Sequence, residues 1–193
     1  MKNYLMLTVV SIFMIGTLGA QHVNFGFKVG LNLADIVSDD NSETSLKPGL
    51  NVGAIAHIHL KNNFALQPEI TYSDQGAKFK SAGIESKLNL GYINIPVLFQ
   101  YMFDNGFRIQ AGPQLGILLS AKAKSNDVSV DVKDDLNVID FAISAGLSYV
   151  HPPSGFGVDA RYNLGLVNLN KEGSVTSTNS VAQIGVFYLF AHK

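Results

Sequence analysis

Apolar and polar residues alternate along segments of about ten residues, and the connections between these segments are alternately short and long. In the first segment, Phe25, Phe27 and Val29 occupy one set of alternate positions, and Gly26 and Lys28 occupy the other. Because successive side chains of a strand point to opposite faces, such a segment has one apolar and one polar face. This pattern is typical of β-strands that face lipid on one side.

Eight segments of this kind can be marked in the chain. They cover residues 24–34, 49–60, 64–73, 90–101, 106–119, 138–150, 156–166 and 181–190. The connections 61–63, 102–105 and 151–154 are short, whereas 35–48, 74–89, 120–137 and 167–180 are long and polar. The sequence therefore predicts an all-β fold, an eight-stranded antiparallel up-and-down transmembrane β-barrel.

Closure of the barrel follows from the cost of an open sheet edge in lipid, where each unpaired backbone group costs several kcal/mol. Outer-membrane barrels have short periplasmic turns and long external loops. We therefore expect the N- and C-termini to be periplasmic and the four long connections to lie outside a Gram-negative cell.

The N-terminal residues have the features of a secretory signal. Lys2 supplies a positive charge, residues 4–15 are largely apolar, and small residues precede Gln21. The apolar run is too short for a membrane-spanning helix, which needs about 20 apolar residues. We predict a signal peptide at residues 1–20, cleaved after Ala20 or alternatively after Gly19, and a barrel domain at residues 21–193.

Composition narrows the function classes. The formal net charge is −1, which gives no reason to expect a nucleic-acid partner. The chain has no cysteine, so neither a disulfide framework nor a lipid-modified cysteine is available.

Five motifs, in order at barrel spacing, resemble the PorT-like outer-membrane β-barrels of the Bacteroidetes, whose architecture is related to the small OmpA and OmpX barrels. They are FKVGLNL (27–33), LQPEITYSDQG (66–76), YINIPVL (92–98), AGPQLG (111–116) and DARYNLG (159–165). The resemblance implies the fold and an outer-membrane location, and for some members a link to protein secretion. Asn94 and Gln100 stand where the family often carries a carboxylate and a lysine, which implies fewer ion pairs inside this barrel.

Six charged residues fall on the polar, inward face of the predicted strands. They are Lys28, Glu69, Arg108, Asp140, Asp159 and Arg161. Side chains nearly fill the interior of an eight-stranded barrel, and an unpaired buried charge is costly. We expect these residues to pair with one another in a structural polar network, and the alternative is a path for ions or protons.

Chemistry beyond this network is sparse. His57 and His59 share the inward face and could bind a metal with Gln67 and Glu69, although such histidines more often form a solvated rim. Segment 120–137 could dock a partner or bind Ca²⁺, although charge runs are usually just solvated. No hydrolase or phosphate-binding motif occurs, so we expect no enzyme activity, no cofactor and no resident metal.

These observations favour a monomeric structural or interaction protein of the cell envelope, whose partners are outer-membrane lipids and envelope proteins that its loops contact. Two alternatives stay open. One is a narrow pore for ions or small solutes. The other is a lipocalin-like barrel that binds an apolar ligand, which would require apolar residues inside and polar residues outside.

Overall fold

The computed structural model describes residues 22–39, 44–81, 84–125, 128–173 and 175–190. The predicted signal peptide and its cleavage site lie outside these residues. The strands are β1 (His22–Ser38), β2 (Thr44–Ser45), β3 (Lys47–His59), β4 (Phe64–Ser81), β5 (Ile84–Met102), β6 (Phe107–Ser125), β7 (Val128–Asp131), β8 (Ile139–Val150), β9 (Phe156–Gly165) and β10 (Ser177–Leu189). A short 3₁₀ helix, η2 (Lys133–Asp135), precedes β8. No helix in the described part of the chain is long and apolar enough to span a membrane.

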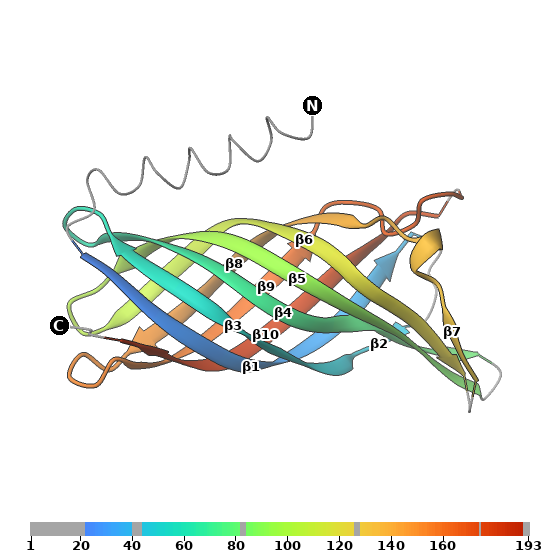
Figure 1. The fold of residues 1–193 in the computed structure, drawn as a ribbon, viewed down its shortest axis with the longest axis horizontal. Coiled ribbons are helices and arrows are strands. Elements are labelled where there is room, and N and C mark those ends of the chain that lie inside the picture. Colours follow the sequence, from blue (N-terminus) through green and yellow to red (C-terminus); the bar gives the residue numbers. More distant parts are fainter. Residues whose placement is uncertain (1–21, 40–43, 82–83, 126–127, 174, 191–193) are drawn as a thin grey trace.

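Eight of these strands form a closed ring, which Figure 1 shows from the side. The order around it is β1, β3, β4, β5, β6, β8, β9, β10, and β10 pairs back to β1, all antiparallel. The two short strands lie outside the ring, because β2 pairs with β4 and β7 pairs with β6. The predicted eight-stranded up-and-down barrel is confirmed.

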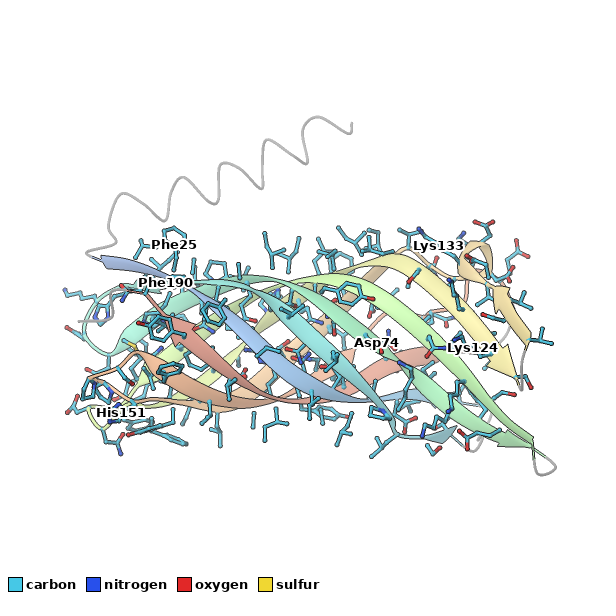
Figure 2. The ribbon with its side chains drawn as sticks, turned by 60° about the horizontal axis from the view of Figure 1, so that its bottom comes forward. Phe25, Asp74, Lys124, Lys133, His151 and Phe190 are labelled. Atoms are coloured by element: carbon cyan, nitrogen blue, oxygen red, sulfur yellow. The ribbon has the colours of Figure 1, made fainter. Side chains whose placement is uncertain are left out.

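The two ends of the barrel differ. At one, here called the turn end, tight connections join β3 to β4, β5 to β6 and β8 to β9, and β1 begins and β10 ends there (Figure 1). The turn before β6 depends on Gly106, whose φ is 89° and whose added Cβ would lie 2.2 Å from the carbonyl oxygen of Val150. The opposite end, here called the loop end, carries the other connections. Figure 2 shows Phe25, His151 and Phe190 at the turn end and Lys124 and Lys133 at the loop end.

The outward face of the ring is apolar. Phe25, Leu31 and Ile184 expose 64%, 56% and 62% of their surface, whereas the interleaved Lys28, Asn32 and Gln183 are buried. Large exposed apolar side chains occur on all eight ring strands. Together they form a belt that suits lipid, because water-exposed apolar surface of this extent is unfavourable.

Aromatic side chains gather on the belt near the turn end. Phe64 stacks on Phe99, with ring centroids 5.3 Å apart, and Tyr188 contacts Phe156 at 4.8 Å. Further ring contacts join these residues to their aromatic neighbours. Such a girdle is typical of the boundary between hydrocarbon and water.

The long connections were predicted incorrectly as loops over much of their length. β4 continues to Ser81 and β5 begins at Ile84, so most of 74–89 is paired strand. β6 likewise continues to Ser125 and pairs with β7 within the predicted loop 120–137. β1 and β3 extend into 35–48, and β10 begins at Ser177 within 167–180.

The extensions of β4, β5 and β6 form strands because most of their inward positions are apolar. Ala77, Leu90 and Ala121 are fully buried, and they pack with Tyr92 and Leu118 in one cluster. Their outward positions are polar, because no lipid covers this part of the barrel. In the sequence these polar residues make the segments look like loops. We call residues 76–81, 84–91 and 120–125, with β2 and β7, the extension sheet.

Candidate functional site

The centre of the barrel holds an ion-pair cluster of four buried residues, here called the central charged cluster. Arg161 lies between two carboxylates: its Nη2 is 2.8 Å from Glu69 Oε1 and 2.6 Å from Asp159 Oδ2. Its Nη1 donates to Glu69 Oε2 at 3.0 Å, so the guanidinium binds both oxygens of Glu69. This paired geometry is the strongest that an arginine and a carboxylate can adopt.

Lys28 completes the cluster. Its Nζ lies 2.8 Å from Asp159 Oδ2 and 3.7 Å from Glu69 Oε2. Two cations therefore face two carboxylates, and their formal charges cancel. Cancellation matters here because all four side chains are almost completely shielded from solvent.

The cluster crosses the lumen from wall to wall. Glu69 is on β4 and Arg161 on β9, and four strand pairings separate these strands in either direction around the ring. An ion pair between opposite strands occupies the middle of the interior. Glycines make room for it on the walls: a Cβ on Gly146 would lie 2.7 Å from the Cβ of Arg161.

The other two predicted residues lie apart from the cluster. Nη1 of Arg108 lies 3.4 Å from Nδ1 of His57, toward the turn end. Asp140 Oδ2 accepts a hydrogen bond of 3.4 Å from Asn179, toward the loop end. Of the six charged residues expected to pair with one another, the structure therefore brings together Lys28, Glu69, Asp159 and Arg161 only.

Two amide networks extend the polar interior, and the sequence analysis did not single them out. On the turn-end side, Gln100 donates to both Gln67 and Gln110, and Gln67 donates to Glu69 at 2.8 Å. The signal was present, because these glutamines occupy inward positions of the alternating pattern. Their partners on other strands were not readable from one strand at a time.

The second network centres on Asn32. Its Oδ1 accepts hydrogen bonds of 2.8 Å from both Asn51 and Gln183, and its Nδ2 donates to Ser73 Oγ at 2.9 Å and to the carbonyl oxygen of Asp74 at 2.8 Å. One side chain thereby links β10, β1, β3 and β4. Every polar atom of this amide has a partner, as a buried amide requires.

Apolar clusters line part of the lumen toward each end. The turn-end cluster contains Ile55, Val150, Phe187 and Leu189. The loop-end cluster contains Ile36, Ala77, Leu90, Tyr92, Leu118, Ala121, Leu136 and Leu169. Buried polar pairs also lie toward both ends, Arg108 with His57 on the turn side and Asp140 with Asn179 on the loop side.

The proposed metal chemistry gains no support from the geometry. Among the residues that the structure describes, no group of three or more His, Cys, Asp or Glu side chains could hold a metal ion. In segment 120–137, Asp131 Oδ1 accepts a hydrogen bond from the backbone N–H of Lys133. Asp127 of that segment lies outside the described residues.

Comparisons with known structures agree with this architecture. Neisserial surface protein A (NspA) is 15% identical, with a TM-score of 0.55, and the match covers 87% of this chain and 99% of that chain. Ail, the attachment invasion locus protein of Yersinia pestis, is 16% identical, with a TM-score of 0.55, and the match covers 88% of this chain and 100% of Ail. At these identities the likeness shows a shared fold alone. A search of curated proteins finds no match.

A family model gives the more specific result. Residues 19–171 match the model described as outer membrane protein beta-barrel domain. The match spans every ring strand from β1 to β9, together with the central charged cluster. This protein therefore belongs to the outer membrane beta-barrel domain family.

Proposed function

We propose that this protein is a monomeric, non-enzymatic outer-membrane barrel with a side-chain-filled lumen, which acts as a structural or interaction protein of the cell envelope. The observation that carries the proposal is the ion pair between Arg161 and Glu69, which joins opposite walls of the lumen. In this role the six inward charged residues are structural, and the four of the central charged cluster stabilise the barrel from inside through their ion pairs.

Burial of the lumen groups argues against the narrow pore. Lys28, Glu69 and Arg161 expose 2%, 2% and 5% of their surface. A solute would have to break the bidentate Arg161–Glu69 pair and also pass the apolar clusters that line part of the lumen toward each end. Removing one partner from a buried ion pair typically costs about 3–5 kcal/mol, which is a large barrier to passage.

The distribution of apolar residues also argues against a lipocalin-like barrel. The belt is apolar outside, and the middle of the lumen is polar. A carrier of apolar ligands would need the reverse arrangement.

Conductance measurements test this proposal directly. The refolded full chain is inserted into planar lipid bilayers beside a wide porin as a positive control. We expect no steady current from this protein at voltages at which the porin conducts. Stable single-channel currents that are lost when Arg161 and Glu69 are replaced by bulky apolar residues would instead establish the narrow pore.

The orientation is part of the same proposal. Short turns, the start of β1 and the end of β10 gather at one end of the barrel, and in outer-membrane barrels this end is periplasmic. The extension sheet would then stand outside the cell, where partners can reach it. A link to protein secretion rests only on the resemblance to PorT-like barrels.

Cysteine labelling tests the orientation, because the chain has no native cysteine. Val128→Cys places a thiol on the exposed β7, and Ser154→Cys places one in an exposed turn at the opposite end. A membrane-impermeant maleimide added to intact cells should label the first variant only. Labelling of Ser154→Cys alone would show that the barrel has the opposite orientation.

Affinity capture tests the interaction role. The tagged barrel is isolated from native envelopes beside a variant that lacks residues 120–131. We expect a specific envelope protein with the intact chain and less of it with the deletion variant. Equal recovery of the envelope protein with both chains would show that residues 120–131 of the extension sheet do not take part in the interaction.

A further inference from the structure

One rung of the extension sheet consists only of lysine and serine. In the strand register, Ser45 of β2 is opposite Lys78 of β4, and Lys78 is opposite Lys87 of β5. Lys87 is opposite Lys124 of β6, and Lys124 is opposite Ser129 of β7. Residues opposite each other in a sheet share one face, so three ammonium groups and two hydroxyl groups stand side by side.

This lysine rung is electrostatically unfavourable on its own. Like charges directly opposite in neighbouring strands destabilise a sheet. Among the residues that the structure describes, Glu85 is the only carboxylate within ion-pair distance of the rung, and its Oε1 is 3.2 Å from Lys87 Nζ. Lys78 and Lys124 form no ion pair within the described part of the chain. Three adjacent cations with one carboxylate leave a local positive charge on a chain whose net charge is −1.

The rung is held by packed structure. The neighbouring positions Ala77, Leu88 and Ala123 lie on the opposite face, where Ala77 and Leu88 contact the loop-end cluster. That packing fixes the register of the three strands, so the lysines cannot move apart by a shift of one strand. A preorganised row of donors is the arrangement that favours binding of an anion.

The direction of the rung limits what can reach it. The lysines alternate with inward residues, so they lie on the outward face that carries the apolar belt nearer the turn end. Figure 2 shows Lys124 at the loop end, well away from the aromatic residues Phe25 and Phe190. A ligand of this rung therefore lies beside the barrel, over the membrane surface, and not in the lumen.

The height of the rung limits the ligand further. Tyr72, an outward aromatic of the belt, and Lys78 are on the same strand. Their positions are separated by about 20 Å along the strand, or roughly 14–16 Å along the membrane normal for a tilt of about 35–45°. The polar headgroup layer of an ordinary bilayer is only about 5–8 Å thick on each side. Phosphates of a phospholipid would therefore lie below the rung.

We propose that the rung Ser45, Lys78, Lys87, Lys124 and Ser129 binds the phosphorylated sugar headgroup of the glycolipid that surrounds the barrel. Lysine ammonium groups pair with phosphate oxygens, and the flanking hydroxyls donate to further oxygens. The rung is about 19 Å wide, from four strand spacings, which allows one headgroup with several phosphates to contact it. This inference rests on the proposed orientation, in which the loop end faces outward.

A binding titration in detergent tests the rung without reference to orientation. The full chain is titrated with fluorescently labelled lipopolysaccharide in the same micelles, and the apparent Kd is compared with that of K78Q/K87Q/K124Q. We expect the triple variant to bind about tenfold or more weakly. The matched control is K61Q/K133Q/K171Q, which removes the same charge from lysines outside the rung and should change the Kd by less than about twofold.

Three further ligands identify the chemical group that is bound. Chemically dephosphorylated lipopolysaccharide, phosphatidylglycerol and the delipidated phosphorylated saccharide should each bind more weakly than intact lipopolysaccharide. Equal binding by the dephosphorylated lipid, or an equal loss in both triple variants, would overturn the assignment. Equal binding by the free saccharide would assign the rung to a soluble polyanion and overturn the lipid as its source.

Folding of the variants is checked by comparing the electrophoretic mobility of heated and unheated samples. Because the substitutions remove repulsion between neighbouring cations, K78Q/K87Q/K124Q should unfold at the same temperature as the wild type or higher in the absence of glycolipid. A lower unfolding temperature would indicate a structural role for the lysines and contradict the proposal. The cysteine labelling described above reports separately on orientation, so its failure can be distinguished from failure of the rung to bind.

Discussion

Gly157 lies directly beneath the ring of Phe187, and a Cβ added to Gly157 would be 2.3 Å from Cζ of that ring. The two residues are opposite each other in β9 and β10. Phe187 is buried in the turn-end cluster with Val150 and Leu189. The missing side chain of Gly157 thus creates the space that the aromatic ring fills.

Gly157→Ala is expected to destabilise the barrel, because the ring must tilt away from its partners. Overpacking of this kind costs about 1–3 kcal/mol. The free energy of unfolding is measured by urea titration of the refolded chain in detergent. Adding Phe187→Leu, which removes the ring atoms nearest to the new methyl group, should recover part of the loss. No recovery would show that the glycine is needed for another reason.

Removing Glu69 should be far more damaging than removing an exposed carboxylate. Glu69→Ala leaves Lys28 and Arg161 facing Asp159 alone, and an unbalanced buried charge costs about 3–5 kcal/mol. Glu85→Ala, at a half-exposed ion pair, is the control and should change stability by less than about 1 kcal/mol.

The charge balance of the cluster predicts strong coupling between Glu69 and Arg161. The double variant Glu69→Ala/Arg161→Ala keeps Lys28 paired with Asp159. Its loss of stability should be smaller than the sum of the two single losses by about 1–3 kcal/mol. Strict additivity in the same urea titration would mean that the two residues do not act as a pair.

Asn32 is expected to be the most sensitive uncharged residue of the lumen. Asn32→Ala leaves the amide donors of Asn51 and Gln183 without their acceptor, and each buried group left without a partner costs about 1–3 kcal/mol. Ser129→Ala, on the exposed β7, is the control and should stay within about 0.5 kcal/mol. If Asn32→Ala lowers the free energy of unfolding no more than the control does, the amide network around Asn32 contributes nothing to stability.

The sequence was sufficient for the ring because lipid imposes a strict rule on it. Every outward position in the belt must be apolar, so the eight strands are visible as alternation alone. The rule ends where the belt ends. Lys78, Lys87 and Lys124 are outward residues of regular strands, yet outside lipid an outward residue can be polar. The alternation there depends on small inward residues such as Ala77 and Ala121.

For the central charged cluster, the sequence predicted only that its residues lie on the inward face. Alternation placed Lys28, Glu69, Asp159 and Arg161 inside, but the distance between two inward residues depends on strand tilt and stagger. Those quantities are properties of the whole ring. This is why Glu69 and Arg161, on opposite strands, are in contact, whereas Arg108 lies beside His57 and outside the cluster.

A charge placed on the outward face should distinguish the belt from the extension sheet. Val29 and Ser129 are both exposed strand residues on this face, and Ser129 is opposite the outward Lys124. Val29 is near the middle of β1 within the belt, whereas Ser129 is on β7 in the extension sheet. Val29→Arg should destabilise the barrel in lipid vesicles by about 2–4 kcal/mol, because the charge enters the hydrocarbon. Ser129→Arg should cost less than about 1 kcal/mol, because its side chain remains in water and only the neighbouring Lys124 opposes its charge. Urea unfolding in vesicles measures both values against the wild type, and repeating it in detergent should narrow the difference, because micelles adapt more easily around a charge. Equal costs for the two variants in vesicles would mean that the belt does not end below the extension sheet, and would remove the height argument for the lysine rung.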